Sequence, residues 1–214
     1  MKQHSGNSHL TDRDRDIFDF LWRFKIATTR AIHVRFFSNR APITAYVRLW
    51  HLRKHGYIEL IAHPRQLHFV WTLSQKGFAQ LDFEPEVLNA FGFKTDSLSH
   101  DILVNAAMIG EFLPDTPKSV AMFTEQELRR MSPSRYPEWV PKDQSHRPDG
   151  YWRIQFQRGP KTIALEVELS RKKSVQYECI ADFYLENPAV DKSLWIVSSP
   201  ALEKLIINSF LSAT

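Results

Sequence analysis

Three acidic side chains in the second half of the sequence have the types and the spacing that a divalent cation needs. Asp149 stands at the head of one expected strand, 149–157, and Glu166 and Glu168 stand in the next, 161–169. Side chains alternate between the two faces of a strand, so Glu166 and Glu168 share a face. Magnesium is a hard cation that prefers oxygen ligands, and carboxylates on adjacent strands can share one ion. These residues indicate an acidic site at one edge of a sheet.

The arrangement resembles the core of the PD-(D/E)xK nuclease-like fold, in which an acid entering the second strand and two alternating residues of the third converge. The resemblance implies a metal-dependent DNA endonuclease with Asp149, Glu166 and Glu168 as catalytic residues and with Asp149 and Glu166 as ligands of Mg²⁺. The sequence departs from the family at Glu168, where the family has a lysine that positions or activates the attacking water. The nearest cations are in the run Arg171–Lys173, which could supply that charge from the end of the strand.

Two other interpretations of these acids remain open. The fold could be retained without catalysis and serve for dimerisation or for docking DNA. Alternatively, Glu166 and Glu168 could line the wet face of a half-buried strand, paired with the run Arg171–Lys173. Mg²⁺ would be needed only by a nuclease, and DNA binding by itself would require no cofactor.

The other notable stretch is PITAYVRLWHLRKHGY, from Pro42 to Tyr57. A proline suited to a first helical position is followed by apolar residues at helical spacing, a basic end and then Gly56 as a stop signal. We expect a helix over 42–55 whose buried stripe is Ala45, Leu49 and Leu52, flanked by Val47 and Trp50. The opposite side carries hydroxyl, guanidinium and imidazole groups that suit base edges and phosphates. It looks like the recognition helix of a winged helix-turn-helix, although a packed helix with a solvated basic face is the alternative.

Charge separates the first part of the chain from the second. The net charge is +4, but residues 1–81 carry 13 Lys and Arg against 5 Asp and Glu, whereas residues 82–214 carry 15 against 19. The first part therefore suits a polyanion and the second part does not. Composition is that of an ordinary globular protein, and the single cysteine, Cys179, excludes an internal disulfide and a cysteine-based zinc site.

The order of elements makes the DNA interpretation specific. We expect helices near 11–24, 29–37 and 42–55, then strands at 57–62 and 67–73 joined by a hairpin, which is the winged-helix order. In this arrangement the third helix enters a major groove and the hairpin touches phosphates. The residues expected at base edges are Thr44, Tyr46, Arg48 and His51, and those expected at phosphates are Thr28, Thr29, Arg30, Arg40, Lys54, Arg65 and His68.

The second part predicts a different architecture. Its pattern is helix, strand, strand, strand, helix, strand, helix, with a proline-rich surface loop at 132–143. The chain is therefore expected to be α+β, with a winged-helix domain at 10–81, a connector at 82–96 and an α/β nuclease-like domain at 97–214 that is catalytically inactive.

Five segments taken in order resemble the replication-relaxation family of bacterial mobile elements. They are LTDRDRDIFDFLWRF, TTRAIHVRFF, YVRLWHLRKHGYIEL, LSQKG, and HRPDGYW with ALEVELSRKK. The resemblance implies a winged-helix DNA-binding protein encoded on plasmids or integrated elements and acting in replication, mobilisation or transcriptional regulation.

The expected partners follow from the charge pattern and the size of the chain. Double-stranded DNA is the expected ligand, and a homodimer through the acidic second part is expected because one monomer would contact only a short site. A protein-interaction module is the rival class, in which the basic charge is incidental. No stretch is apolar for the roughly 18 residues of a membrane helix, so no membrane partner and a cytoplasmic location are expected.

Overall fold

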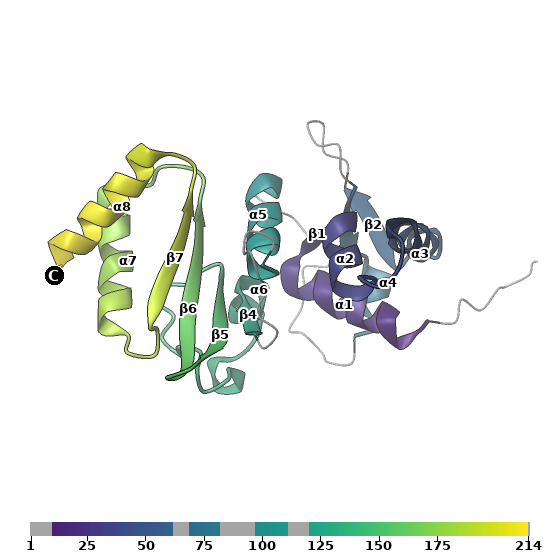
Figure 1. Cartoon of the computed structure of the whole chain (residues 1–214), viewed down its shortest axis with the longest axis horizontal. Helices are drawn as coiled ribbons and strands as arrows, with labels where there is room; N and C mark the ends of the chain where they lie inside the picture. Colours follow the sequence, from purple (N-terminus) through teal and green to yellow (C-terminus); the bar gives the residue numbers. More distant parts are fainter. Residues whose placement is uncertain (1–9, 62–68, 82–96, 111–119, 214) are drawn as a thin grey trace, which may run out of the picture. The chain divides into compact units, whose positions relative to one another are not determined.

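The computed structural model describes residues 10–61, 69–81, 97–110 and 120–213. The chain is α+β and divides into two compact units, Met1–Asp96 and Ser97–Thr214, each of which has its own sheet (Figure 1). The expected connector 82–96 and the whole of the expected hairpin turn, 63–66, lie outside the described residues.

The first unit begins with α1 (Asp12–Phe24), whose start is fixed by a capping box. Thr11 accepts a hydrogen bond from the backbone N–H of Asp14, and the Asp14 carboxylate accepts one from the Thr11 N–H at 2.7 Å. Ile17, Phe20 and Leu21 then form a buried side, as the apolar spacing predicts. This helix therefore begins and packs as its sequence indicates.

Two further helices follow at short intervals. Thr28 caps α2 (Thr29–Phe36) by accepting a hydrogen bond from the Ala31 N–H at 3.0 Å. Pro42 occupies the first turn of α3 (Pro42–Lys54), and Gly56 ends the segment with a φ of 76° that other residues rarely adopt.

The buried stripe of α3 is confirmed, but one of its predicted flanks is wrong. Ala45, Leu49 and Leu52 are buried, whereas Val47 is 58% exposed. With 3.6 residues per turn, Val47 lies nearly opposite the centre of the buried stripe. The apolar side chain of Val47 suggested a position beside the buried stripe, but its place on the helix faces solvent.

A three-stranded antiparallel sheet completes the first unit. Its strands are β1 (Ile26–Thr28), β2 (Ile58–Ile61) and β3 (Val70–Leu73), in the order β1-β3-β2. The short strand β1 was not expected from the sequence. The helical turn α4 (Gln75–Phe78) follows β3, with Ser74 as its cap.

The second unit has the expected order of principal elements around a four-stranded sheet. After α5 (Leu98–Met108) come β4 (Val120–Thr124), α6 (Glu125–Arg130), β5 (Gly150–Phe156), β6 (Gly159–Glu168), α7 (Ser174–Glu186), β7 (Lys192–Val197) and α8 (Pro200–Ala213). The strand order is β4-β5-β6-β7, antiparallel except that β6 and β7 are parallel. Figure 1 shows α7 and α8 together beside β7.

The proline-rich segment is more than a surface loop. It contains a 3₁₀ turn at Pro133–Arg135, and Tyr136 and Val140 are buried in one cluster with Phe123 and Tyr151. The Tyr136 hydroxyl donates a hydrogen bond to the Leu128 carbonyl at 2.5 Å. The prolines prevent regular structure, as predicted, but the side chains between them complete the core on this side of the sheet.

Cys179 lies on α7 and is exposed. In the described ranges, no helix has the length and apolar character needed to cross a bilayer.

Candidate functional site

The exposed side of α3 is the first candidate surface. Thr44 and Lys54 are exposed there, as expected for DNA contacts. His51 is half-buried, and its ring centroid lies 4.3 Å from that of His55. Partial burial and the electrostatic effects of His55 and Arg48 lower the pKa of His51. His51 therefore favours the neutral form, which can donate at one ring nitrogen and accept at the other.

Arg48 is placed differently from the expectation. Its Nε donates a hydrogen bond to Asp14 Oδ1 at 2.7 Å, and a second guanidinium nitrogen pairs with Asp14 Oδ2. Asp14 is only 1% exposed, so this bidentate pair holds the guanidinium against the body of the unit. Arg48 therefore connects α3 to α1.

The two threonines expected at phosphates also have partners within the unit. Thr28 caps α2, and the Thr29 hydroxyl accepts a hydrogen bond from Trp71 Nε1 at 2.8 Å. Both residues position α2 against β3. These hydrogen bonds explain why threonine stands at both positions, whether or not either hydroxyl contacts a phosphate.

Tyr46 belongs to an aromatic cluster rather than to an isolated base-contacting position. Its ring centroid lies 5.9 Å from that of Trp50 and 5.7 Å from that of Phe69. The guanidinium of Arg53 lies 4.6 Å from the centre of the Trp50 ring. The cluster fixes one side of α3 to the start of β3.

Two of the remaining residues expected at phosphates are exposed arginines. Arg30 and Arg40 are exposed, and the Arg40 carbonyl is 2.8 Å from His33 Nε2. Arg65 and His68, expected at phosphates, lie outside the described residues. Of the expected set, Arg40, Thr44 and Lys54 thus lie exposed along α3 and the turn before it.

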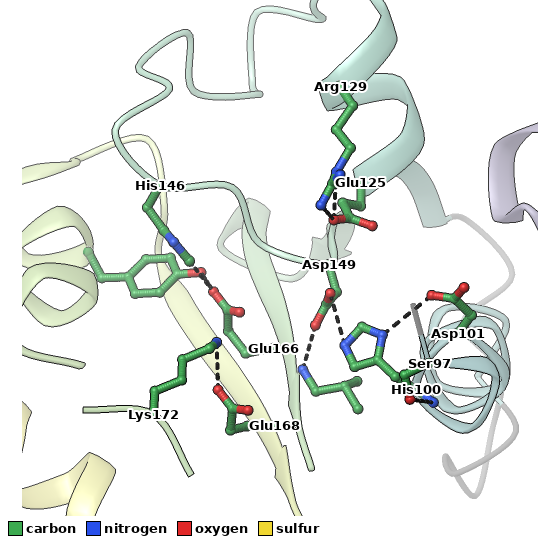
Figure 2. A network of polar contacts seen from close by, with 12 residues as sticks. Ser97, His100, Asp101, Glu125, Arg129, His146, Asp149, Glu166, Glu168 and Lys172 are labelled. Carbon is green, nitrogen blue, oxygen red and sulfur yellow. Dashed lines mark hydrogen bonds and ion pairs between the residues drawn. The ribbon is translucent and has the colours of Figure 1, made fainter. Parts of the chain in front are cut away.

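The acidic residues of the second unit form the other candidate site (Figure 2). Asp149 immediately precedes β5, and its Oδ2 accepts a hydrogen bond from the Val167 N–H on β6 at 2.7 Å. Its Oδ1 lies 3.3 Å from His100 Nε2 on α5, while His100 Nδ1 lies 3.4 Å from Asp101 Oδ1. Hydrogen bonds to Asp101 and Asp149 raise the pKa of His100 to about 10, so an imidazolium links α5 to the head of β5.

Glu166 is buried on β6 and is held by two side chains. His146 Nε2 and the Tyr184 hydroxyl each lie 2.5 Å from its Oε1. Burial raises the pKa of Glu166, although the hydrogen bonds from His146 and Tyr184 oppose that rise. The interpretation of this glutamate as a residue on a wet strand face is wrong, because both faces of β6 are covered here.

Glu168 is also buried, and it pairs with a lysine. The nuclease-like motif has a lysine where this chain has Glu168, and here the lysine comes from four residues further along the chain. Lys172 Nζ lies 2.6 Å from Glu168 Oε2. Burial lowers the pKa of Lys172, but hydrogen bonding and attraction to Glu168 dominate and raise it. Of the run Arg171–Lys173, Lys172 is therefore the residue whose ammonium reaches the acidic site.

The donor types fit a magnesium ion only if water and phosphate complete its coordination. Mg²⁺ commonly takes one or two carboxylates and keeps several waters. Asp149 and Glu166 offer two carboxylates from adjacent strands, and the negative charge of Asp149 contributes to raising the Glu166 pKa. Within the described ranges, no group of three or more His, Cys, Asp or Glu side chains could hold a metal ion.

Sequence reasoning missed the three side chains that bind the two acids. His146 begins the segment HRPDGYW, whereas His100 and Tyr184 lie in expected helices that carry no motif. The available signal was the polar character of His100 within an otherwise apolar helix. A buried carboxylate needs a donor, but the sequence alone does not say which donor comes near it.

Comparison of the chain with protein-family models, with curated proteins and with solved structures gave no match.

Proposed function

We propose that the first unit is a winged helix-turn-helix that binds double-stranded DNA by placing α3 in the major groove. The observation that carries this proposal is the arrangement of α3. The sheet β1-β3-β2 and helices α1 and α2 occupy one side of it, and its other side is exposed and carries Thr44 and Lys54. A helix presented in this way fits a major groove.

The charge of the unit supports a nucleic acid over a protein partner. Residues 1–81 have eight more Lys and Arg than Asp and Glu. Arg40 lies two residues before α3 and Lys54 is its last residue, so exposed cations stand near both ends of the helix. Phosphates on the two sides of a groove would meet these ends while the middle of the helix faces the bases.

The test is a fluorescence-anisotropy titration of the full chain with a mixed-sequence duplex at several salt concentrations. The double variant Arg40→Ala/Lys54→Ala is expected to bind more weakly and to reduce the slope of log K against log salt by about 2, because each lost phosphate contact removes about 0.9. The matched control, Lys142→Ala/Lys204→Ala, removes two exposed cations of the second unit and should leave the slope unchanged.

Absence of binding by the parent chain at low salt, where phosphate contacts are strongest, would overturn the proposal in favour of a protein-interaction module. With binding established, the resemblance to replication-relaxation proteins extends the proposal to a cytoplasmic DNA-binding protein of a bacterial plasmid or integrated element. Its role there would be replication, mobilisation or transcriptional regulation.

The second unit would join two copies of the chain. β7 is an edge strand of the four-stranded sheet, and an edge strand can pair with its own copy about a two-fold axis. Ile207 and Leu211 on α8 are exposed and line a groove together with Trp195 and Val197 of β7. A dimer would cover these apolar side chains and present two copies of α3 to one duplex.

A second candidate function is metal-dependent DNA cleavage by the acidic site. The observation that favours it is Lys172, whose ammonium lies beside Glu168 although the lysine of the nuclease-like motif is absent. Asp149 and Glu166 would hold Mg²⁺, which when bound would polarise a phosphodiester and supply a water of lowered pKa. Lys172 would position the phosphate by its charge.

Incubation with supercoiled plasmid and either Mg²⁺ or Mn²⁺ tests this candidate. Cleavage is expected to require metal and to be lost in Asp149→Asn and in Lys172→Met, with Lys161→Met as the control for loss of a lysine elsewhere on the sheet. DNA that is shifted in mobility but stays uncut with both metals would reject cleavage and leave DNA binding as the function.

A further inference from the structure

The exposed side of α3 is aliphatic, not basic, over the first two turns of the helix. Ile43 is 61% exposed and Val47 is 58% exposed. They are four residues apart and therefore lie one above the other on the helix surface, about 6 Å apart along its axis. Both lie in the first half of α3, and both are directed away from the buried Ala45 and Leu49.

The one arginine in the first two turns of α3, Arg48, is held by a carboxylate of α1. Arginine recognises guanine by donating two hydrogen bonds to its O6 and N7. Arg48 Nε and a terminal nitrogen of its guanidinium already donate to the two oxygens of Asp14. The exposed side chains of the first two turns of α3 are therefore those of Pro42, Ile43, Val47 and Thr44, and the methyl group of Thr44 is also apolar.

In the major groove, the apolar group of an unmodified base is the C5 methyl of thymine. We infer that Ile43, Thr44 and Val47 contact thymine methyl groups, so that the DNA bound by α3 is rich in A·T pairs where its first two turns lie. This inference rests on the proposed DNA binding. The distance of about 6 Å between Ile43 and Val47 along the helix is close to two base-pair steps of about 3.4 Å each.

Charge complementarity selects DNA as the occupant of this patch. A purely apolar protein surface would leave Arg40 and Lys54 facing an apolar partner at both ends of the helix. A duplex meets all of these groups at once, because its phosphates border the groove and the thymine methyls line its floor. Recognition by methyl contacts also removes exposed apolar surface from water, which favours binding by itself.

The experiment replaces thymine with uracil in a duplex selected for tight binding from a random pool. This change removes only the C5 methyl and keeps every hydrogen-bonding group of the base pair. The parent chain is expected to bind about fourfold more weakly for each contacted methyl removed, which is about 0.8 kcal/mol per buried methyl. Positions not facing α3 should tolerate the replacement.

Val47→Ala supplies the second arm of the test. In this variant, uracil at the position facing residue 47 is expected to have little further effect, because the contact is already lost. Val175→Ala is the matched control, since Val175 is also a valine, is 56% exposed and lies on α7 of the other unit. This control should show the full uracil effect.

The outcomes separate the inference from the function on which it rests. No binding of any duplex by the parent at low salt overturns both. Tight binding with equal affinity for thymine and uracil duplexes overturns the inference alone. A uracil effect of the same size in Val47→Ala and the parent also overturns it, as does a loss of dimer mass in Val47→Ala, which would make the patch a protein interface.

Discussion

Asp14 on α1 and Arg48 on α3 form a bidentate ion pair in which the carboxylate is buried and the guanidinium reaches it from a helix 34 residues further along the chain. The same carboxylate accepts hydrogen bonds from the N–H and the hydroxyl of Thr11, each at 2.7 Å. The Asp14 side chain thus caps the start of α1 and also holds Arg48 of α3. The consequence is that the helix proposed to enter DNA is oriented by an electrostatic contact as well as by its apolar side.

Arg48→Ala is expected to lower the free energy of unfolding of the first unit by about 2–3 kcal/mol. Removing one partner of a buried pair leaves the other charge uncompensated, and the partial exposure of Arg48 reduces the full penalty. Urea denaturation followed by circular dichroism measures the change. Arg35→Ala, an exposed arginine on α2, serves as the control and should change stability by less than about 0.5 kcal/mol. Parent-like stability of Arg48→Ala combined with weakened DNA binding would return Arg48 to the base edges.

The pair should also make the first unit sensitive to acid. Burial by itself raises the pKa of Asp14, but hydrogen bonds from Arg48 and Thr11 outweigh it and hold the pKa below the ordinary value of 3.8. A lowered folded-state pKa adds stability that is fully present above the unfolded-state pKa and is lost as the pH falls below it. Thermal unfolding from pH 7 to pH 3 should therefore show a steeper acid loss in the parent than in Asp14→Asn. Parallel curves would contradict this assignment.

Gly150 leaves little room for a side chain. A Cβ at this position would lie 2.7 Å from both Sδ and Cε of Met108 and 3.2 Å from the Phe123 carbonyl oxygen. Gly150→Ala is expected to destabilise the second unit by about 1–3 kcal/mol, because α5 packs directly on the backbone of β5. The double variant Gly150→Ala/Met108→Ala should lose less stability than the sum of the two single variants. Strict additivity in urea denaturation would show that Met108 does not limit the site.

Ile207→Glu is expected to convert a dimer into a monomer. Ile207 is 50% exposed on α8 beside the edge strand β7, and a buried unpaired glutamate would oppose association there. Multi-angle light scattering at micromolar concentration measures the mass. Leu185→Glu is the control, since Leu185 is 48% exposed on α7 outside that groove and should leave the mass unchanged. A monomeric parent chain would remove the proposed interface altogether.

The sequence predicted the elements whose signals are local. Thr11, Thr28, Pro42 and Gly56 each act within one helical turn, and the helices that they delimit begin and end within a residue or two of the expected positions. The α+β class and the order of the principal helices and strands along the second unit are likewise confirmed. Period and capping are properties of short segments, so a single sequence contains them in full.

Apart from the exposed flank of α3 at Val47, the features that the sequence did not predict depend on distant partners. β1 is three residues long and is defined by its pairing with β3, in which Ile26 lies opposite Thr72. The pair of Arg48 with Asp14 joins residues 34 positions apart, and the two donors to Glu166 lie 20 and 18 positions from it. Residue type and spacing identify a polar side chain that needs a hydrogen-bonding or ionic partner. Only the fold determines which distant residue becomes that partner.

The exposed thiol of Cys179 gives the chain a single point of attachment for a spin label without any mutation. In a symmetric assembly, every copy would carry the label at an equivalent place, so pulsed electron resonance would return one distance between the two copies. A monomer would return none. The geometry of the assembly on a duplex, including whether the copies approach or separate when DNA is added, can therefore be followed on the natural sequence.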